Sequence, residues 1–172
     1  MNPLIRLGLK YFLVFMFVYL LALAILGYLS GDEFWKVIIE STLFGSLLSI
    51  ISILITRSNL NKAGIDNITD NTLKVNQKIN LVSKLTIKEI GSIIYRDTHL
   101  SATRINTKED SIKFKIGTSW SSWGEILDIK LVKTNDEINH LYQINSSPRL
   151  KTTLVDFGKN YLNIERVVSL LT

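Results

Sequence analysis

The chain has 172 residues, of which 47% are hydrophobic, and 20 Lys and Arg against 15 Asp and Glu residues give a formal net charge of +5. It contains no Cys, which excludes a disulfide-stabilised scaffold and mildly favours a reducing compartment. The basic residues are spread along the polar part of the chain, which favours a solvated surface over a patch for anionic lipid or nucleic acid. We expect no nucleic-acid partner.

Two long apolar runs open the chain, Tyr11–Leu29 and Phe34–Thr56, with a short polar turn at 30–33 between them. Each run is close to the roughly 20 residues that cross the hydrocarbon core of a bilayer. Asn2 suits a helix cap and Pro3 the first helical position, so we expect the first helix to begin before the membrane. The sequence predicts a transmembrane hairpin with spans at about 11–29 and 34–56.

A cleaved signal peptide is the alternative for the first run. The run is too long and bulky for one, and no small-residue cleavage site follows it. Arg6 and Lys10 precede the first span and Arg57 and Lys62 follow the second, whereas the turn region has only Lys36, beside two acids. The positive-inside bias therefore places both termini in the cytoplasm. The Asn-, Ile- and Lys-rich composition suggests a bacterial source, so we expect a multi-pass protein of the bacterial inner membrane.

Small residues recur every four positions in the second span, at Ser41, Gly45 and Ser49. Such a stripe lets another helix approach closely. The simplest partner is the first span, and the alternative is a membrane helix of another protein. The first span offers three small residues for this contact: Ala22, Ala24 and Gly27.

Glu40 is an ionisable residue about one turn inside the second span. An acid at membrane depth is a functional hypothesis by default. Glu40 is near enough to the boundary to reach headgroups or water, which is the alternative interpretation.

The rest of the chain resembles an ordinary soluble protein. Residues 58–70 are polar and contain Gly64, which is typical of a linker, and 71–172 are enough for one small domain with its own core. Leu73, Val75 and Ile79 indicate a first strand. The apolar spacing over Leu85–Tyr95 predicts a short amphipathic helix.

From Leu100 the hydrophobic period changes to two, which is typical of half-buried strands. We expect four strands joined by short polar turns, an antiparallel meander. They lie around Ile105, at 112–116, at 126–131 and at 139–145. A final helix is predicted over Tyr161–Leu171, with Asn160 as its cap. The predicted fold is a two-helix transmembrane hairpin (1–57) followed by a small α+β domain with an antiparallel sheet, in the order β-α-β-β-β-β-α.

No motif for catalysis or cofactor binding is present. A metal site is not expected either, because the two histidines, His99 and His140, have no acidic partner at ligand spacing. Two segments contain more aromatic or short polar residues than a plain domain requires. In the segment 118–125, Trp120 and Trp123 either cap the core or form an exposed surface for lipid or a partner.

The second of these segments joins the last strand to the last helix and is rich in short polar residues. Its short polar residues and Gly158, which tolerates a positive φ, favour a hydrogen-bonded loop, with an Arg149–Asp156 ion pair as one expected contact. The alternative is an anion site at the Arg149 guanidinium. The candidate residues of this site are Arg149, Thr152, Asp156, Gly158 and Asn160.

The run SSPRLKTTLVDFGKN, after a sheet that contains TSWSSWGEILDIKL, resembles the C-terminal half of a family of uncharacterised bacterial proteins. That family has a Ser-x-Ser-Arg stretch and then an Asp-x-Gly-x-Asn signature before a final helix. Asp156, Gly158 and Asn160 match the second part, and Ser147 and Arg149 approximate the first, with Pro148 between them. The resemblance implies the fold of the last sixty or so residues and no activity.

We therefore expect a non-enzymatic membrane-anchored module, an accessory or scaffold subunit with a protein partner in the membrane. The rival is a tethered domain that binds a lipid or small apolar molecule between sheet and helix. A hydrolase that uses His140 or Asp156 is a weaker third alternative.

Overall fold

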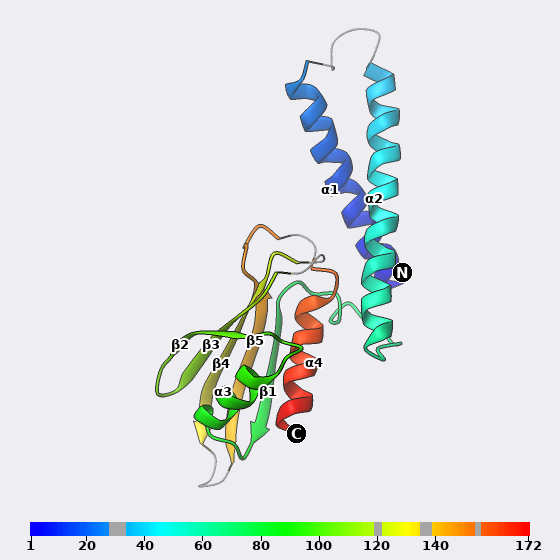
Figure 1. Ribbon diagram of the computed structural model, residues 1–172. Coiled ribbons are helices and arrows are strands. Elements are labelled where there is room, and N and C mark those ends of the chain that lie inside the picture. The colour runs from blue at the N-terminus through cyan, green and yellow to red at the C-terminus, as the bar shows by residue number, and fades with distance from the viewer. Residues whose placement is uncertain (28–33, 119–121, 135–138, 154–155) are drawn as a thin grey trace. The chain divides into compact units, whose positions relative to one another are not determined.

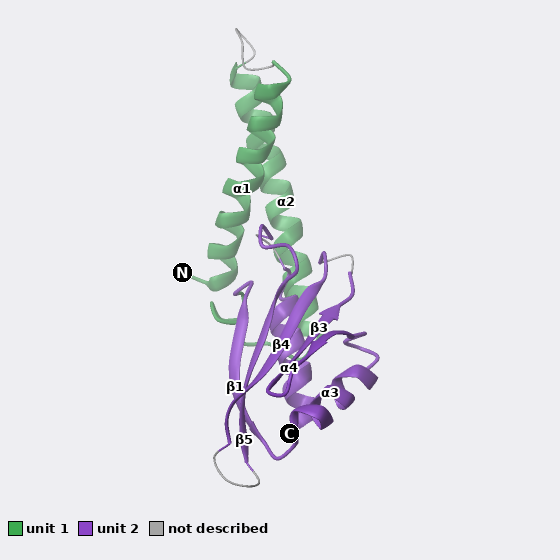
Figure 2. Ribbon diagram, turned by 90° about the vertical axis from the view of Figure 1, so that its left-hand side faces the viewer, with its two compact units in different colours: residues 1–73 green, residues 74–172 purple. Residues whose placement is uncertain are grey.

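The computed structural model describes residues 1–27, 34–118, 122–134, 139–153 and 156–172. The chain forms two compact units, residues 1–73 and 74–172 (Figure 2). The first unit contains helices α1 (Pro3–Ile25) and α2 (Phe34–Lys62), and the second contains the sheet and two shorter helices (Figure 1). Because α2 continues to Lys62, the segment between helix and sheet starts later than the predicted linker at 58–70.

Both helices of the first unit are long and apolar enough to cross a membrane, with 23 residues in α1 and 29 in α2. The start of α1 is as predicted: Pro3 is in the first turn, and the Asn2 Oδ1 accepts a hydrogen bond from the Leu4 N–H at 2.9 Å. This bond satisfies one of the donors that a helix N-terminus leaves free.

The two helices contact each other along a narrow seam. In α2 the buried positions recur every three or four residues and are mostly small or hydroxyl-bearing: Val37, Ser41, Gly45, Ser49, Ser52, Thr56 and Leu60. Large apolar side chains elsewhere on both helices are exposed, among them Phe17 at 64% and Leu43 at 65%. The apolar surface of this unit therefore faces outward.

The second unit has a five-stranded antiparallel sheet. Its strands are β1 (Gln77–Ser83), β2 (Thr103–Thr107), β3 (Ser111–Ile116), β4 (Glu125–Thr134) and β5 (His140–Pro148). The predicted meander is confirmed, because β2 to β5 pair in chain order. The order across the sheet is β1-β5-β4-β3-β2, so β1 lies beside β5, which the chain order alone does not indicate. The first strand also starts at Gln77, after Leu73 and Val75.

Two helices cover one face of this sheet, α3 (Ile87–Arg96) and α4 (Lys159–Leu171) (Figure 1). Helix α3 begins with a capping box, which was not expected from the sequence. The Thr86 hydroxyl accepts a hydrogen bond from the Glu89 N–H, and the Glu89 carboxylate accepts one from the Thr86 N–H. Both helices and strands β3, β4 and β5 supply the buried side chains of a single core, and Ile79 and Leu81 of β1 pack against it. Its apolar side chains at 0% exposure are Ile90, Ile94, Phe114, Leu127, Ile129, Ile144 and Val167.

The opposite face of the sheet, which we call the open face, is polar. Strand alternation places Lys113 of β3, Asp128 of β4 and Asn145 of β5 there, in one row of directly paired residues. The second unit is therefore a two-layer α+β domain with its core between the sheet and the helices.

Candidate functional site

The predicted anion site is divided between the two faces of the sheet. Arg149 follows β5 and lines a groove on the open face, whereas Asp156, Gly158 and Asn160 are buried on the core side, at the start of α4. The expected Arg149–Asp156 ion pair is wrong, since the hydrogen bonds to Asp156 come from the residues that follow it. Thr152 is exposed between these two places.

Asp156 organises the start of α4. The residue is 3% exposed, and its carboxylate accepts hydrogen bonds from the Gly158 N–H at 3.2 Å, the Asn160 N–H at 3.1 Å and the Asn160 side-chain amide at 3.0 Å. Gly158 has a φ of 77°, as the sequence led us to expect. Asn160 was expected to cap the helix, and this is wrong: the helix begins at Lys159, and Asp156 binds the first-turn N–H groups instead.

The same cluster connects α4 to β5 through buried polar side chains. The Ser146 hydroxyl donates to the Asn160 Oδ1 at 2.7 Å and accepts from the Asn163 amide at 3.3 Å. Ser146 is 0% exposed and Asn163 is 3% exposed. The core therefore has a polar end here, whereas further along α4 the buried residues are Ile164 and Val167.

Glu125 is the residue of this cluster that sequence reasoning missed. It is 1% exposed at the start of β4, and neither of its carboxylate oxygens has a well-aligned hydrogen-bond partner among the described residues. Burial raises the pKa of Glu125; the side chains of Ser122 and Asn163 and the charge of Lys159 offset this only in part, and the Asp156 charge adds to it. Burial also raises the pKa of Asp156, because it outweighs the hydrogen bonds from Asn160 and Gly158, which lower the pKa.

A sequence signal for Glu125 exists in the alternation of β4. Leu127 and Ile129 are 0% exposed, and stepping back two residues along a strand returns to the same face. Ile126, the next residue in the strand, lines the groove of the open face.

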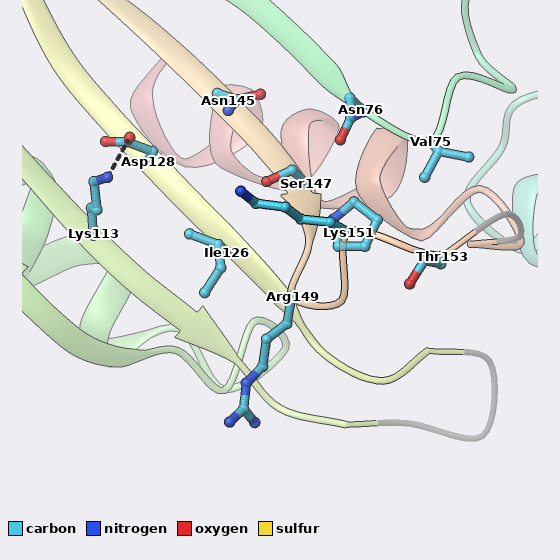
Figure 3. Close-up of a pocket in the computed structure, with 11 residues that line it drawn as sticks. Val75, Asn76, Lys113, Ile126, Asp128, Asn145, Ser147, Arg149, Lys151 and Thr153 are labelled. Atoms are coloured by element: carbon cyan, nitrogen blue, oxygen red, sulfur yellow. Dashed lines mark ion pairs between the residues drawn. The ribbon is translucent and has the colours of Figure 1, made fainter.

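The groove on the open face has a volume of about 500 Å³. Its charged residues are Lys113, Asp128, Arg149 and Lys151, and Lys113 pairs with Asp128 at 3.1 Å. Figure 3 shows Lys151 directed along the groove toward Ser147, with the Arg149 guanidinium directed away from Lys151. Polar side chains complete much of the wall: Asn76, Asn145, Ser147 and Thr153.

Trp123 lies close to this groove in the fold. The carbonyl of the next residue, Gly124, accepts a hydrogen bond from the Arg149 N–H at 2.9 Å, so the two loops meet at the end of the sheet. Trp123 is 71% exposed, which makes it a surface residue and not a cap of the core. Leu150, next to Arg149, is 48% exposed. Trp120 lies outside the described residues.

The small-residue stripe of α2 faces α1. The Ser49 hydroxyl donates to the Gly8 carbonyl at 2.6 Å, and a Cβ added at Gly45 would lie 3.1 Å from backbone atoms of Phe12 and Met16. Within this chain the stripe therefore packs against the first span, but against other residues of that span than expected. Ala22 and Gly27 are exposed and Ala24 is half-buried, because the hairpin turn sets Gly45 opposite residues further from the loop.

Glu40 lies in the second turn of α2 and is half-buried. Among the described residues, no three His, Asp or Glu side chains are grouped as a metal site would require. His140 stands in β5, with its Nδ1 3.4 Å from the Thr134 hydroxyl.

No family model and no curated protein matches this sequence. The resemblance of the Asp-x-Gly-x-Asn run to a bacterial family therefore remains a prediction from the residues that carry it.

Proposed function

We propose that this chain is a non-enzymatic membrane-anchored module, in which a transmembrane hairpin tethers the α+β domain to the cytoplasmic face of a bacterial inner membrane. The observation that carries this proposal is the outward apolar surface of α1 and α2. Only 11% of the most apolar stretch of α1 and 22% of that of α2 are buried. A core helix of a soluble protein would be mostly buried, so a lipid environment explains these surfaces better.

The charge distribution supports the proposed orientation. Arg6 and Lys10 lie at the start of α1, and Arg57 and Lys62 lie at the other end of the hairpin from the turn, near the end of α2. In an antiparallel hairpin these four cations share one end, which the positive-inside bias assigns to the cytoplasm. A single cleaved signal sequence does not account for a second apolar helix that packs against the first through Gly45 and Ser49.

The role of an accessory or scaffold subunit is supported by exposed surface on the domain. Trp123 is 71% exposed next to a polar groove, and both described helices of this unit, α3 and α4, pack against the other face of the sheet. The rival role, a pocket for an apolar ligand between sheet and helices, is less well supported. Side chains such as Phe114, Leu127 and Val167 fill that layer at 0% exposure.

The anchor is tested with a reporter fusion after Thr172 in a bacterial host. A fluorescent protein there should be active and alkaline phosphatase inactive, because the C-terminus is proposed to be cytoplasmic. As the matched control, the same phosphatase fused after residue 30, behind one span, should be active. The full chain should also stay in the membrane pellet after alkaline carbonate extraction. Phosphatase activity at Thr172, or release by carbonate, would contradict the anchor.

The subunit role needs a separate experiment. The tagged chain is purified from membranes in a mild detergent, and a partner membrane protein should co-purify in a constant ratio. A chain that inserts with the expected topology and yet runs alone, at the mass of one or two copies, would exclude the accessory role and leave the anchor intact.

A further inference from the structure

The open face of the sheet is rich in lysine. Directly paired residues of an antiparallel sheet share a face, so the rows across the strands can be followed in the pairing. One row runs from Lys78 through Asn145 and Asp128 to Lys113, and the neighbouring row on the same face brings in Lys115. Among the described residues of these two rows, Asp128 is the one acid, and it pairs with Lys113 at 3.1 Å.

The excess positive charge continues into the groove at the end of β5. Arg149 and Lys151 both line it, and neither forms an ion pair with a described residue. The side chains of Asn145, Ser147 and Thr153 also line the groove, and they offer hydrogen-bond donors of the kind that bind phosphate oxygens. A volume of about 500 Å³ accommodates a phospholipid headgroup.

Apolar surface adjoins these cations. Trp123 is 71% exposed and Leu150 is 48% exposed, and the backbone bond from Arg149 to Gly124 holds their two loops together. Trp beside Lys and Arg is the combination that prefers the boundary between headgroups and acyl chains. A site for a soluble anion has no need of the exposed Trp and Leu side chains.

The segment that joins the hairpin to the domain limits the distance between the end of α2 and the start of β1. The segment 63–76 between α2 and β1 spans at most about 50 Å when fully extended, at 3.3–3.6 Å per residue. A domain held by such a segment experiences a high effective concentration of the bilayer surface, so even weak contacts become populated.

We propose that the groove and the adjoining Trp123 and Leu150 dock on the surface of an anionic bilayer, with Arg149 and Lys151 bound to phospholipid phosphates. The docking rests on the proposed function, since it uses the membrane that holds the hairpin. Each Lys or Arg near an anionic surface contributes about 1 kcal/mol, a factor of about five in the docking equilibrium.

The full chain in lipid nanodiscs tests this. Because the chain has no Cys, Thr152→Cys places a single environment-sensitive fluorophore beside the groove. Its emission should shift to the blue and brighten in discs of phosphatidylcholine with 30% phosphatidylglycerol, and not in phosphatidylcholine alone. The same label at Thr98→Cys, on the turn after α3, should respond to neither composition. Raising the salt to 0.5 M should remove the response, because it screens exposed charges.

The double variant Arg149→Gln/Lys151→Gln should lower the docked fraction relative to the undocked one by tenfold or more. The matched control Lys88→Gln/Arg96→Gln removes the same charge from exposed positions on α3 and should leave the response unchanged. An equal loss of docking in both double variants would mean that docking depends on net charge alone, and this would overturn the groove as the docking site.

Three further results would overturn the proposal. These are an equal response in neutral and anionic discs, a groove variant that docks like the wild type, and an equal shift in neutral discs on adding inorganic phosphate or a single-stranded oligonucleotide. The last would make the groove a site for a soluble anion or for nucleic acid. Failure of the anchor itself is distinguishable, because the chain would then not enter the discs with the topology measured by the reporter fusions.

Discussion

Arg166 of α4 donates hydrogen bonds from its Nε and Nη2 to the same oxygen of Asp97, at 3.1 and 2.6 Å. The other oxygen of Asp97 accepts from the Leu100 N–H at 2.8 Å. The Asp97 side chain is 5% exposed and that of Arg166 is 40% exposed. One carboxylate therefore fixes both the turn that ends α3 and the position of α4 over the sheet.

This pair predicts a loss of stability in acid. Burial alone would raise the pKa of Asp97, but the hydrogen bonds from Arg166 and Leu100 hold it below its usual value. The folded state thus binds the proton less tightly than the unfolded chain. The contribution to the free energy of unfolding is present above the unfolded pKa and is lost as the pH falls through the lower folded pKa. Urea unfolding followed by pulse proteolysis, from pH 7 to pH 3, measures this.

Arg166→Gln should lower the free energy of unfolding by about 1–2 kcal/mol at pH 7, between the values for exposed and for buried pairs, because Arg166 is partly solvated. The variant should also lose part of the acid dependence. Arg149→Gln is the control, since Arg149 lines the groove and has no ion pair with a described residue. Equal stability of Arg166→Gln and wild type would show that the pair contributes nothing.

Glu125 predicts the opposite pH dependence. Burial raises its pKa, so the folded domain holds the proton more tightly than the unfolded chain, and stability falls as the pH rises from the unfolded pKa through the folded one. Glu125→Gln keeps the shape and removes the charge, so it should raise the free energy of unfolding at pH 8 and flatten the fall of that free energy with rising pH. We expect the pH dependence that remains in this variant to come from Asp156, because burial raises the pKa of that residue too. Destabilisation by Glu125→Gln at pH 8 would mean that the ionised carboxylate is needed.

Gly158→Val should destabilise the domain by about 1–3 kcal/mol, because its φ of 77° is costly for a β-branched residue. Gly117→Val is the matched control: it is an exposed glycine without a positive φ, and an added Cβ meets nothing within 4 Å. The midpoint of urea unfolding should fall for the first variant and stay within error for the second. Similar midpoints for both would show that the start of α4 tolerates rearrangement.

Gly45→Leu should open the hairpin. A Cβ there already lies 3.1 Å from the Phe12 carbonyl oxygen and the Met16 nitrogen, and these backbone atoms cannot move aside as a side chain does. Thr42→Leu adds comparable bulk at an exposed position of α2 and serves as the control. Thermal stability in a mild detergent should fall for Gly45→Leu alone. An unchanged Gly45→Leu protein would place the stripe outside the helix contact.

The sequence determined the features that depend on residues close together in the chain. The two apolar runs, the Asn2 cap with Pro3, and the alternation of Ile112 and Phe114 on β3 were all predictable. Each depends on a local period or on a hydrogen bond across a few residues, so no distant partner has to be known. Gly158 belongs here too, because only glycine adopts a positive φ without cost.

The tertiary structure decided which side of the sheet each functional residue occupies. Arg149 and Asp156 are seven positions apart in one loop, yet the first faces the groove and the second is buried under α4. The face of a strand residue depends on register, and a shift of one residue moves the whole strand to the other face. The place of β1 beside β5 and the inward position of Glu125 follow from pairings between distant segments. The free energy of those pairings comes from burial shared by the whole core, which no local pattern contains.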